Sequence, residues 1–167
     1  MAKTLYLMRH AKSGWTDMSQ SDFDRPLNKR GQRDAPEMGR RLKKRDVKPE
    51  IILCSPAQRS RQTLEQLIRE FGGTMKTVQF DDRIYEADPD TLLDVIRSLP
   101  EAFASAMVIG HNPSMGRLAN QLSDVRIEQM PTCAVATLEL PSSRWKDTGT
   151  QTARLLHFDY PKRRPEG

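Results

Sequence analysis

The sequence has few cysteines and no long apolar run. Its two cysteines, Cys54 and Cys133, in 167 residues are too few for a disulfide scaffold and lack the spacing of metal ligands. No apolar stretch is long enough to cross a bilayer. The first residues lead directly into an apolar segment typical of a strand, which leaves no room for a signal peptide. We therefore expect a soluble globular protein of the reducing cytoplasm, with no membrane contact.

Aromatic residues are also scarce, at 6% of the chain, and the formal net charge is +5. Basic residues cluster within positions 40–45 and 162–164, and no aromatic residue is interleaved with them. Proteins that bind single-stranded nucleic acid combine cations with stacking rings, so we expect no nucleic-acid partner. We interpret the two clusters as a solvated helix face and a solvated tail. The positive charge is compatible with an anionic substrate.

Apolar segments that favour β-structure alternate with helical patterns over residues 4–122. Segments typical of strands are residues 4–8, 50–54, 77–80, 106–109, 133–140 and 153–160. Helical patterns cover residues 29–45, 55–71, 90–98 and 114–122. This order predicts an α/β fold, a three-layer α/β/α sandwich with a mostly parallel sheet and one antiparallel strand from the closing hairpin. No linker or repeat interrupts residues 1–167, so we expect a single domain.

Two details of the predicted helices depend on proline. Pro36 is expected to kink the helix at 29–45 or to break its first turns. Ser55 followed by Pro56 is typical of a helix N-cap with proline at the first helical position. Before the first of these helices, the polar residues 11–28 predict a loop with little regular structure. A loop of that length is usually functional.

Chemically reactive side chains follow four of the predicted strands. Ligands bind at the carboxyl ends of the strands in an open α/β sheet, so we expect these side chains to meet at one edge. In chain order they are Arg9, His10, Arg59, Glu86, His111 and Asn112. His157, the remaining histidine, lies inside a predicted strand, and we expect a structural role for it.

These residue types suit the binding of a phosphoryl group. Arg9 and Arg59 can each donate two hydrogen bonds to phosphate oxygens. His111, if protonated, adds a further donor, and we place Asn112 in the same phosphate-binding set. Such a site requires no metal or other cofactor, and no residue spacing in the sequence predicts a metal centre.

His10 is the predicted nucleophile. It attacks phosphorus in line and becomes phosphohistidine, which water then hydrolyses. The two nearby arginines would lower the pKa of this histidine, which keeps it neutral and able to attack. Glu86 is the expected proton donor to the leaving atom and the later activator of water. Asp22 and Asp24 are the alternatives for that role.

Three motifs together resemble those of the histidine phosphatase superfamily, whose fold is also called phosphoglycerate-mutase-like. They are residues 7–11 (LMRHA), 55–63 (SPAQRSRQT) and 108–112 (VIGHN). The resemblance extends over nearly the whole chain. It implies the phosphoglycerate-mutase-like fold and a phosphorylated intermediate on His10. It also implies that Arg9, Arg59 and His111 complete the phosphate pocket.

Ala11 indicates the branch of the family, because it stands where the family's opening motif carries glycine. Together with residues 24–28 (DRPLN), Gly31 and Ala35, it resembles the small SixA-type phosphohistidine phosphatases. The helix that contains Arg59 leads to the next strand without the inserted lid of many members that act on small molecules. The resemblance implies an open site that the surface of a phosphorylated, phosphotransfer-type protein can reach.

The leading hypothesis is a metal-independent phosphatase that removes phosphate from phosphohistidine in signalling proteins, acting as a cytoplasmic monomer. The same chemistry on small phosphomonoesters, such as sugar or nucleotide phosphates, is the alternative. A non-catalytic phosphate-binding module is a third hypothesis, which the presence of His10 disfavours. A cysteine phosphatase is also disfavoured. Only four residues separate Cys54 from Arg59, where that chemistry, by resemblance to the tyrosine phosphatases, needs one more.

Overall fold

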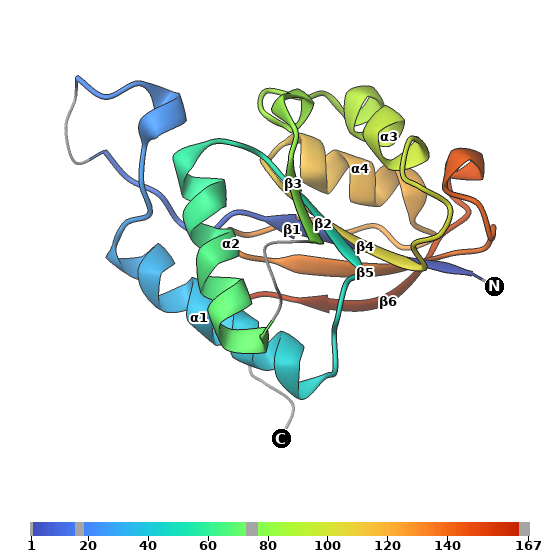
Figure 1. Cartoon of the computed structure of the whole chain (residues 1–167), viewed down its shortest axis with the longest axis horizontal. Helices are drawn as coiled ribbons and strands as arrows, with labels where there is room; N and C mark the ends of the chain where they lie inside the picture. Colours follow the sequence, from blue (N-terminus) through green and yellow to red (C-terminus); the bar gives the residue numbers. More distant parts are fainter. Residues whose placement is uncertain (1, 16–18, 73–76, 164–167) are drawn as a thin grey trace.

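The computed structural model describes residues 2–15, 19–72 and 77–163, and within them a six-stranded sheet forms the centre of the molecule (Figure 1). The strands are β1 (Lys3–Arg9), β2 (Ile51–Cys54), β3 (Val78–Phe80), β4 (Ser105–Gly110), β5 (Val135–Leu140) and β6 (Arg154–Asp159). They lie in the order β3-β2-β4-β1-β5-β6. The pairs among β1 to β4 are parallel, whereas β5 is antiparallel to both β1 and β6. The mostly parallel sheet with one antiparallel strand is therefore confirmed.

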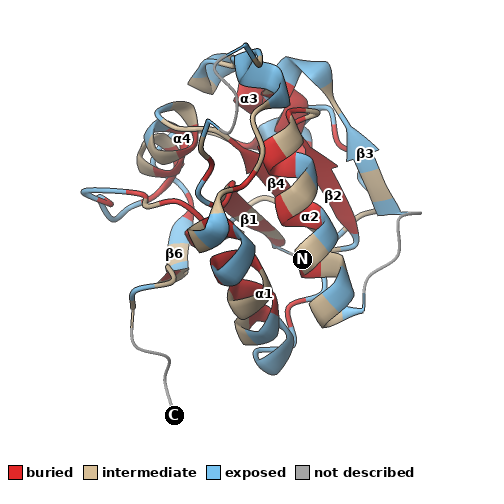
Figure 2. Ribbon diagram, turned by 90° about the vertical axis from the view of Figure 1, so that its left-hand side faces the viewer, coloured by how far each residue is buried: buried red, intermediate tan, exposed pale blue. Residues whose placement is uncertain are grey.

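Two pairs of helices cover the two faces of this sheet. In the described residues they are α1 (Lys29–Lys44), α2 (Gln58–Phe71), α3 (Pro89–Arg97) and α4 (Ser114–Leu122). Figure 1 shows α1 and α2 on one side of the sheet, with α3 and α4 on the other. The central strands between them are buried (red in Figure 2). These layers form the predicted three-layer α/β/α sandwich.

The side chains of β1 explain why both faces need a helical cover. Leu5 and Leu7 belong to the core cluster that contains residues of α3 and α4. Met8 points to the opposite face and belongs to the cluster that contains residues of α1 and α2. Successive side chains of a strand alternate between faces, so a strand that is apolar at both kinds of position must be buried on both sides.

Pro36 lies inside α1 (Lys29–Lys44), which is helical on both sides of the proline. The expected break in the first turns of this helix is therefore wrong. The helix begins at a regular cap, because the side chain of Asn28 accepts a hydrogen bond of 2.9 Å from the Gly31 amide. Met38 and Leu42 on the buried face of α1 are almost completely covered, and this packing offsets the hydrogen bond that proline removes.

The N-cap predicted at Ser55 is also wrong, because α2 begins at Gln58 with Ala57 at the cap position. Ser55 is fully buried, and its hydroxyl oxygen lies 2.7 Å from His111 Nε2. The chain uses residues 55–57 to turn from β2 into the helix. This turn leaves the serine at the edge of the sheet rather than in the first helical turn.

Three neighbouring parallel strands end at the same edge of the sheet. His10 follows β1, Ser55 follows β2, and His111 follows β4. The register is fixed by backbone hydrogen bonds of 3.0 Å, from the His10 amide to the Gly110 carbonyl and from the Ser55 amide to the Ile109 carbonyl. The topology thus brings together three segments that are far apart in the sequence.

The loop between β1 and α1 is largely irregular, as predicted, but it contains the short 3₁₀ helix η1 (Asp22–Asp24). An isolated antiparallel bridge joins Ser13 to Leu27 at the base of the loop. No helix in the described part of the chain is long and apolar enough to span a membrane. Arg164 of the basic tail lies outside the described residues.

Candidate active site

His10 is almost completely buried directly after β1, with 7% of its surface exposed. Its Nδ1 lies 2.7 Å from the carbonyl oxygen of Ala11. A carbonyl only accepts, so Nδ1 carries the proton, and Nε2 of the neutral ring carries the free electron pair. Nε2 faces Arg59, whose Nε donates to it at 3.4 Å. The ring therefore presents a nucleophilic nitrogen toward a cation.

The pKa of His10 is lowered from 6.5 to about 3, chiefly by burial. The positive charges of Arg59 and Arg9 add to the effect, against the hydrogen bond to Ala11, which raises it. A histidine with such a pKa is neutral at neutral pH. The expectation of a neutral, attacking His10 agrees with this geometry, although burial contributes more than the arginines.

Two guanidinium groups flank His10 from different elements. Arg59, on the first turn of α2, is 5% exposed. Arg9 comes from the end of β1, and its Nη1 donates to the Met130 carbonyl at 3.0 Å. The Nε of Arg9 is buried and has no hydrogen-bond partner in the described part of the structure. A bound phosphate would give both cations a counter-charge.

Asp22 holds the outer end of Arg59. The two Nη atoms donate to the Asp22 backbone carbonyl at 2.8 Å and to its Oδ2 at 3.1 Å. The same carboxylate accepts hydrogen bonds from the Tyr85 hydroxyl at 2.8 Å and from Arg25 at 2.9 Å. Arg59 is thereby fixed before any ligand arrives.

The ionisation of Asp22 argues against its use as a proton donor. Burial by itself would raise its pKa, but hydrogen bonds from Tyr85 and the charge of Arg59 outweigh this and lower the pKa to about 2. The group is therefore a carboxylate at neutral pH. Asp24 is exposed, and its carboxylate accepts a local hydrogen bond from the Ser21 hydroxyl.

His111 lies beside His10, with ring centroids 5.1 Å apart. Burial first, and then the charge of Arg59, lower the pKa of His111 to about 4. The ring is thus neutral before a ligand binds. His111 can become the protonated donor expected from the sequence only when the negative charge of a phosphate lies beside it. Its Nδ1 is buried without a partner in the described residues, while Nε2 bonds to Ser55.

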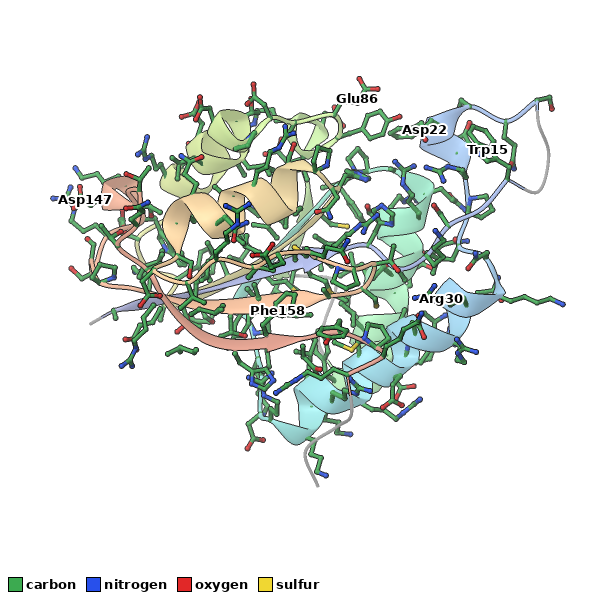
Figure 3. All side chains as sticks on the ribbon, turned by 180° about the vertical axis from the view of Figure 1, so that it is seen from behind. Trp15, Asp22, Arg30, Glu86, Asp147 and Phe158 are labelled. Atoms are coloured by element: carbon green, nitrogen blue, oxygen red, sulfur yellow. The ribbon has the colours of Figure 1, made fainter. Side chains whose placement is uncertain are left out.

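Glu86 and Asn112 are placed differently from the four residues above. Glu86 is exposed, and Figure 3 shows its carboxylate pointing outward at the top of the molecule. The side chain of Asn112 is occupied at both ends, since it donates to the Met130 carbonyl at 2.8 Å and accepts from the Gly116 amide at 3.2 Å. Because Arg9 donates to the same carbonyl, Asn112 helps to position Arg9.

The sequence did not indicate several residues that shape the site. The sequence predicts Ser55 as a helix cap, and it points to Glu86 rather than to its neighbour Tyr85. Thr63 accepts a hydrogen bond of 2.9 Å from the Ala11 amide and donates one of 2.8 Å to the Arg59 carbonyl. The available signal for Ser55 was its position as the first polar residue after a buried strand. Thr63 ends the central motif, and its position there was its only signal.

The two cysteines are unsuited to chemistry. Cys54 and Cys133 are fully buried and unpaired, and burial raises the pKa of both thiols. A buried thiol with a raised pKa is a poor nucleophile. Among the described residues, no group of three or more His, Cys, Asp or Glu side chains could hold a metal ion.

A cavity of about 420 Å³ opens beside Arg9 at the end of β1. It lies between α4 and the segment around Met130, and its walls include Arg9, Asn112 and Arg117. A substrate held by its phosphate at Arg9 has room there for the rest of a small molecule.

Comparisons with known proteins agree with this geometry. The family model of the histidine phosphatase superfamily (branch 1) matches residues 5–107. An uncharacterized protein of Mycobacterium tuberculosis is 33% identical over 165 residues, which cover 93% of this chain and 100% of that protein. The phosphohistidine phosphatase SixA of Escherichia coli is 29% identical over 145 residues, with 83% of this chain and 86% of that protein covered.

A solved structure supports the same relationship. It is the protein histidine phosphatase SixA complexed with tungstate, which is 25% identical to this chain and superposes with a TM-score of 0.81. The match covers 95% of this chain and 97% of that structure. The phosphoglycerate-mutase-like α/β fold expected from the sequence is thereby confirmed.

Proposed function

The chain belongs to the histidine phosphatase superfamily (branch 1), and on that premise we propose that it removes phosphate from phosphohistidine in proteins. The family supports phosphatase activity. The observation that carries the mechanism is the neutral His10 ring, whose Nδ1 is bound to Ala11 and whose Nε2 faces Arg59. The names of the SixA relatives support phosphohistidine as the substrate.

In the first step, Nε2 of His10 attacks the phosphorus. A bond forms between Nε2 and phosphorus as the bond from phosphorus to the substrate nitrogen breaks, and that nitrogen keeps the electron pair. Arg9 and Arg59 stabilise the charge on the phosphoryl oxygens. Nδ1 of His10 keeps its proton throughout, so the attack needs no base.

The leaving group explains why this site can work without an acidic residue at the reaction centre. When the other ring nitrogen of the substrate imidazole is protonated, the ring leaves as neutral imidazole and takes no proton from the enzyme. This departure therefore needs no acid. Asp22 is ionised and Glu86 is exposed, which is compatible with a reaction that requires no proton donor. A phosphate ester, by contrast, has an alkoxide leaving group that requires a proton.

In the second step, water attacks the phosphorus of the phosphorylated His10. The bond from phosphorus to Nε2 breaks, and the ring recovers its electron pair, while the water's proton leaves with the phosphate or to solvent. The hydrogen bond from Nδ1 to Ala11 favours the positively charged phosphorylated ring, which is the better leaving group.

A quench-flow experiment tests the nucleophile. The protein is mixed briefly with a ³²P-labelled phosphohistidine protein and stopped in acid or in base. We expect the trapped label to survive base and to be lost in acid, and we expect none in His10→Ala. His157→Ala is the matched control, because this histidine lies in β6 away from the site, and it should trap label normally. Label retained by His10→Ala would contradict the assignment.

A substrate panel tests the substrate class. The cavity beside Arg9 favours small phosphate esters as the second candidate. We expect kcat/KM for a phosphorylated phosphotransfer domain to exceed that for sugar phosphates, nucleotides and p-nitrophenyl phosphate. Efficient turnover of an ester without turnover of the phosphoprotein would favour the second candidate and refute the first.

A further inference from the structure

A row of rings leads from the nucleophile to the protein surface. The centroid of His10 lies 5.1 Å from that of His111, which lies 5.6 Å from that of Tyr85. Tyr85 in turn contacts Phe23 edge to face, with centroids 5.1 Å apart and an interplanar angle of 87°. These spacings are those of aromatic contacts, so the row forms one continuous side of the site.

The outer part of this row is held in place by the site itself. The Tyr85 hydroxyl donates to Asp22 Oδ2 at 2.8 Å, and Asp22 accepts from Arg59. Burial and the hydrogen bond to Asp22 raise the pKa of Tyr85, so the hydroxyl remains a donor. Phe23 follows Asp22 within η1. The ring positions are therefore tied to the arginine that binds phosphate.

Phe23, at the outer end of the row, is an exposed apolar side chain. Large apolar side chains exposed in the described part of the chain are Trp15, Phe23, Phe80, Val125 and Leu156. Two of the three aromatic ones, Trp15 and Phe23, belong to the loop between β1 and α1. Figure 3 shows Trp15 and Asp22 on this loop at one end of the molecule. Covering such rings with a ligand is favourable, because it removes apolar surface from water.

Resting on the proposed function, we infer that Tyr85 and Phe23 form the wall that receives the leaving group, and that they select an aromatic ring bonded directly to phosphorus. Tyr85 contacts His111 directly. It therefore lies where the part of the substrate nearest the phosphate would be. In phosphohistidine that part is a planar imidazole. In a sugar phosphate it is an aliphatic, hydroxylated carbon, and in a nucleotide the ribose separates the base from the phosphate.

Two small substrates isolate this contact. N-phosphoimidazole and phosphoramidate share the bond from phosphorus to nitrogen, but only the first has an aromatic leaving group. The quantity measured is the ratio of their kcat/KM values, which cancels effects on the phosphoryl group. We expect Phe23→Ala and Tyr85→Leu each to lower this ratio roughly three- to tenfold, the size of one aromatic contact.

Two further variants serve as controls. Tyr85→Phe keeps the ring and removes the hydroxyl, so it should retain more of the ratio than Tyr85→Leu. Phe80→Ala removes another exposed ring, on β3, with 45% of its surface exposed against 37% for Phe23. This ring lies under Arg61 and outside the row, so its removal should leave the ratio unchanged. An exposed position such as Phe23 tolerates truncation, so the test does not depend on Tyr85→Leu alone.

The outcomes separate this inference from the proposed function. If the unmodified protein hydrolyses both substrates but Phe23→Ala and Tyr85→Leu keep the same ratio, the leaving-group wall is refuted and the phosphatase stands. A fall of the same size in Phe80→Ala also refutes it. If the unmodified protein hydrolyses neither substrate nor the phosphoprotein, the proposed function fails, and the inference fails with it.

Discussion

At the scale of single residues, the site depends on hydrogen bonds that keep the proton of the His10 ring on Nδ1 and leave Nε2 unprotonated. Nδ1 is committed to the Ala11 carbonyl, and Nε2 meets the Nε of Arg59. Asp22 in turn fixes the outer amino groups of Arg59. The guanidinium groups beside His10 therefore have their positions before phosphate arrives, which is the condition for effective electrostatic catalysis.

Arg59→Lys tests the geometry of this cation rather than its charge. A lysine keeps the positive charge but has no planar fork, so it cannot bond to Asp22 and to the His10 side of the site at once. We expect kcat/KM for the phosphoprotein to fall by about 100-fold or more. Arg61→Lys is the control, since Arg61 is exposed on the same helix. Equal activity of the two variants would contradict the role of the fork.

The pKa of His10 predicts a dependence of stability on pH. The pKa is about 3 in the folded protein against an ordinary value of 6.5, so between these values the unfolded chain binds more protons. Stability should therefore be complete above pH 6.5 and fall as the pH drops toward 3, by about 1 kcal/mol per pH unit for this group.

Urea unfolding of the protein and of His10→Gln at pH 7 and pH 5 measures this effect. The variant lacks the titrating group, so its free energy of unfolding should decrease less on acidification, by about 1–2 kcal/mol. His111 titrates in both proteins and cancels to first order. The same loss in both would show that His10 is not buried in its neutral form.

At the scale of the elements, the segment that carries His10 is held against the N-terminal halves of two helices. The Ala11 amide donates to Thr63 of α2. The carbonyl of the following residue, Lys12, accepts a hydrogen bond of 3.0 Å from the Asn28 amide at the start of α1. A Cβ atom added at Gly31 would lie only 2.0 Å from the Lys12 carbonyl oxygen. The glycine is therefore required by this close approach.

Gly31→Ala should destabilise the fold even though alanine favours a helix. The clash is with backbone, so the segment after His10 must move, and we expect a loss of about 1–3 kcal/mol in urea unfolding together with lower kcat/KM. Gly116→Ala in α4 is the matched control, since its nearest neighbours lie 3.5 Å away. That change should be neutral or stabilising, by up to about 1 kcal/mol. Similar results for both glycines would argue against the clash.

At the scale of the whole molecule, two layers of helices cover the faces of the sheet. The candidate active site lies at the edge where the parallel strands β1, β2 and β4 end. β1 and β4 are neighbours in the sheet, although β2 and β3 lie between them in the sequence, so the two histidines that follow them come together. The loop between β1 and α1 reaches the same edge and adds Asp22 and Phe23. The site thus combines segments from four parts of the chain.

The assembled site predicts activity without a metal. Two arginines already supply the positive charge that a cation would bring to the phosphate, and the described residues contain no cluster of three or more metal-binding side chains. We expect kcat to be unchanged after treatment with EDTA and desalting. Activity that is lost with EDTA and restored by a divalent cation would contradict the mechanism.

The local patterns were sufficient for the strands, for most helix limits and for the place of four candidate site residues at one edge of the sheet. Apolar runs define strands because a sheet covered on both faces must be apolar on both. Arg9, His10, Arg59 and His111 could be expected at one edge, because parallel strands end together. The two prolines predicted the course and the start of the helices less well than the apolar pattern did. The effect of Pro36 is overridden by the packing of α1, and Pro56 does not place Ser55 at a cap.

The fold class follows from residue types at short range along the chain, and the same patterns predict His10 as the nucleophile. The environment of the remaining groups depends on the tertiary structure. Burial makes His111 neutral, Asp22 becomes the anchor of Arg59, and Glu86 is left exposed. The physical reason is that the pKa and the hydrogen-bond partners of a side chain depend on neighbours from distant segments.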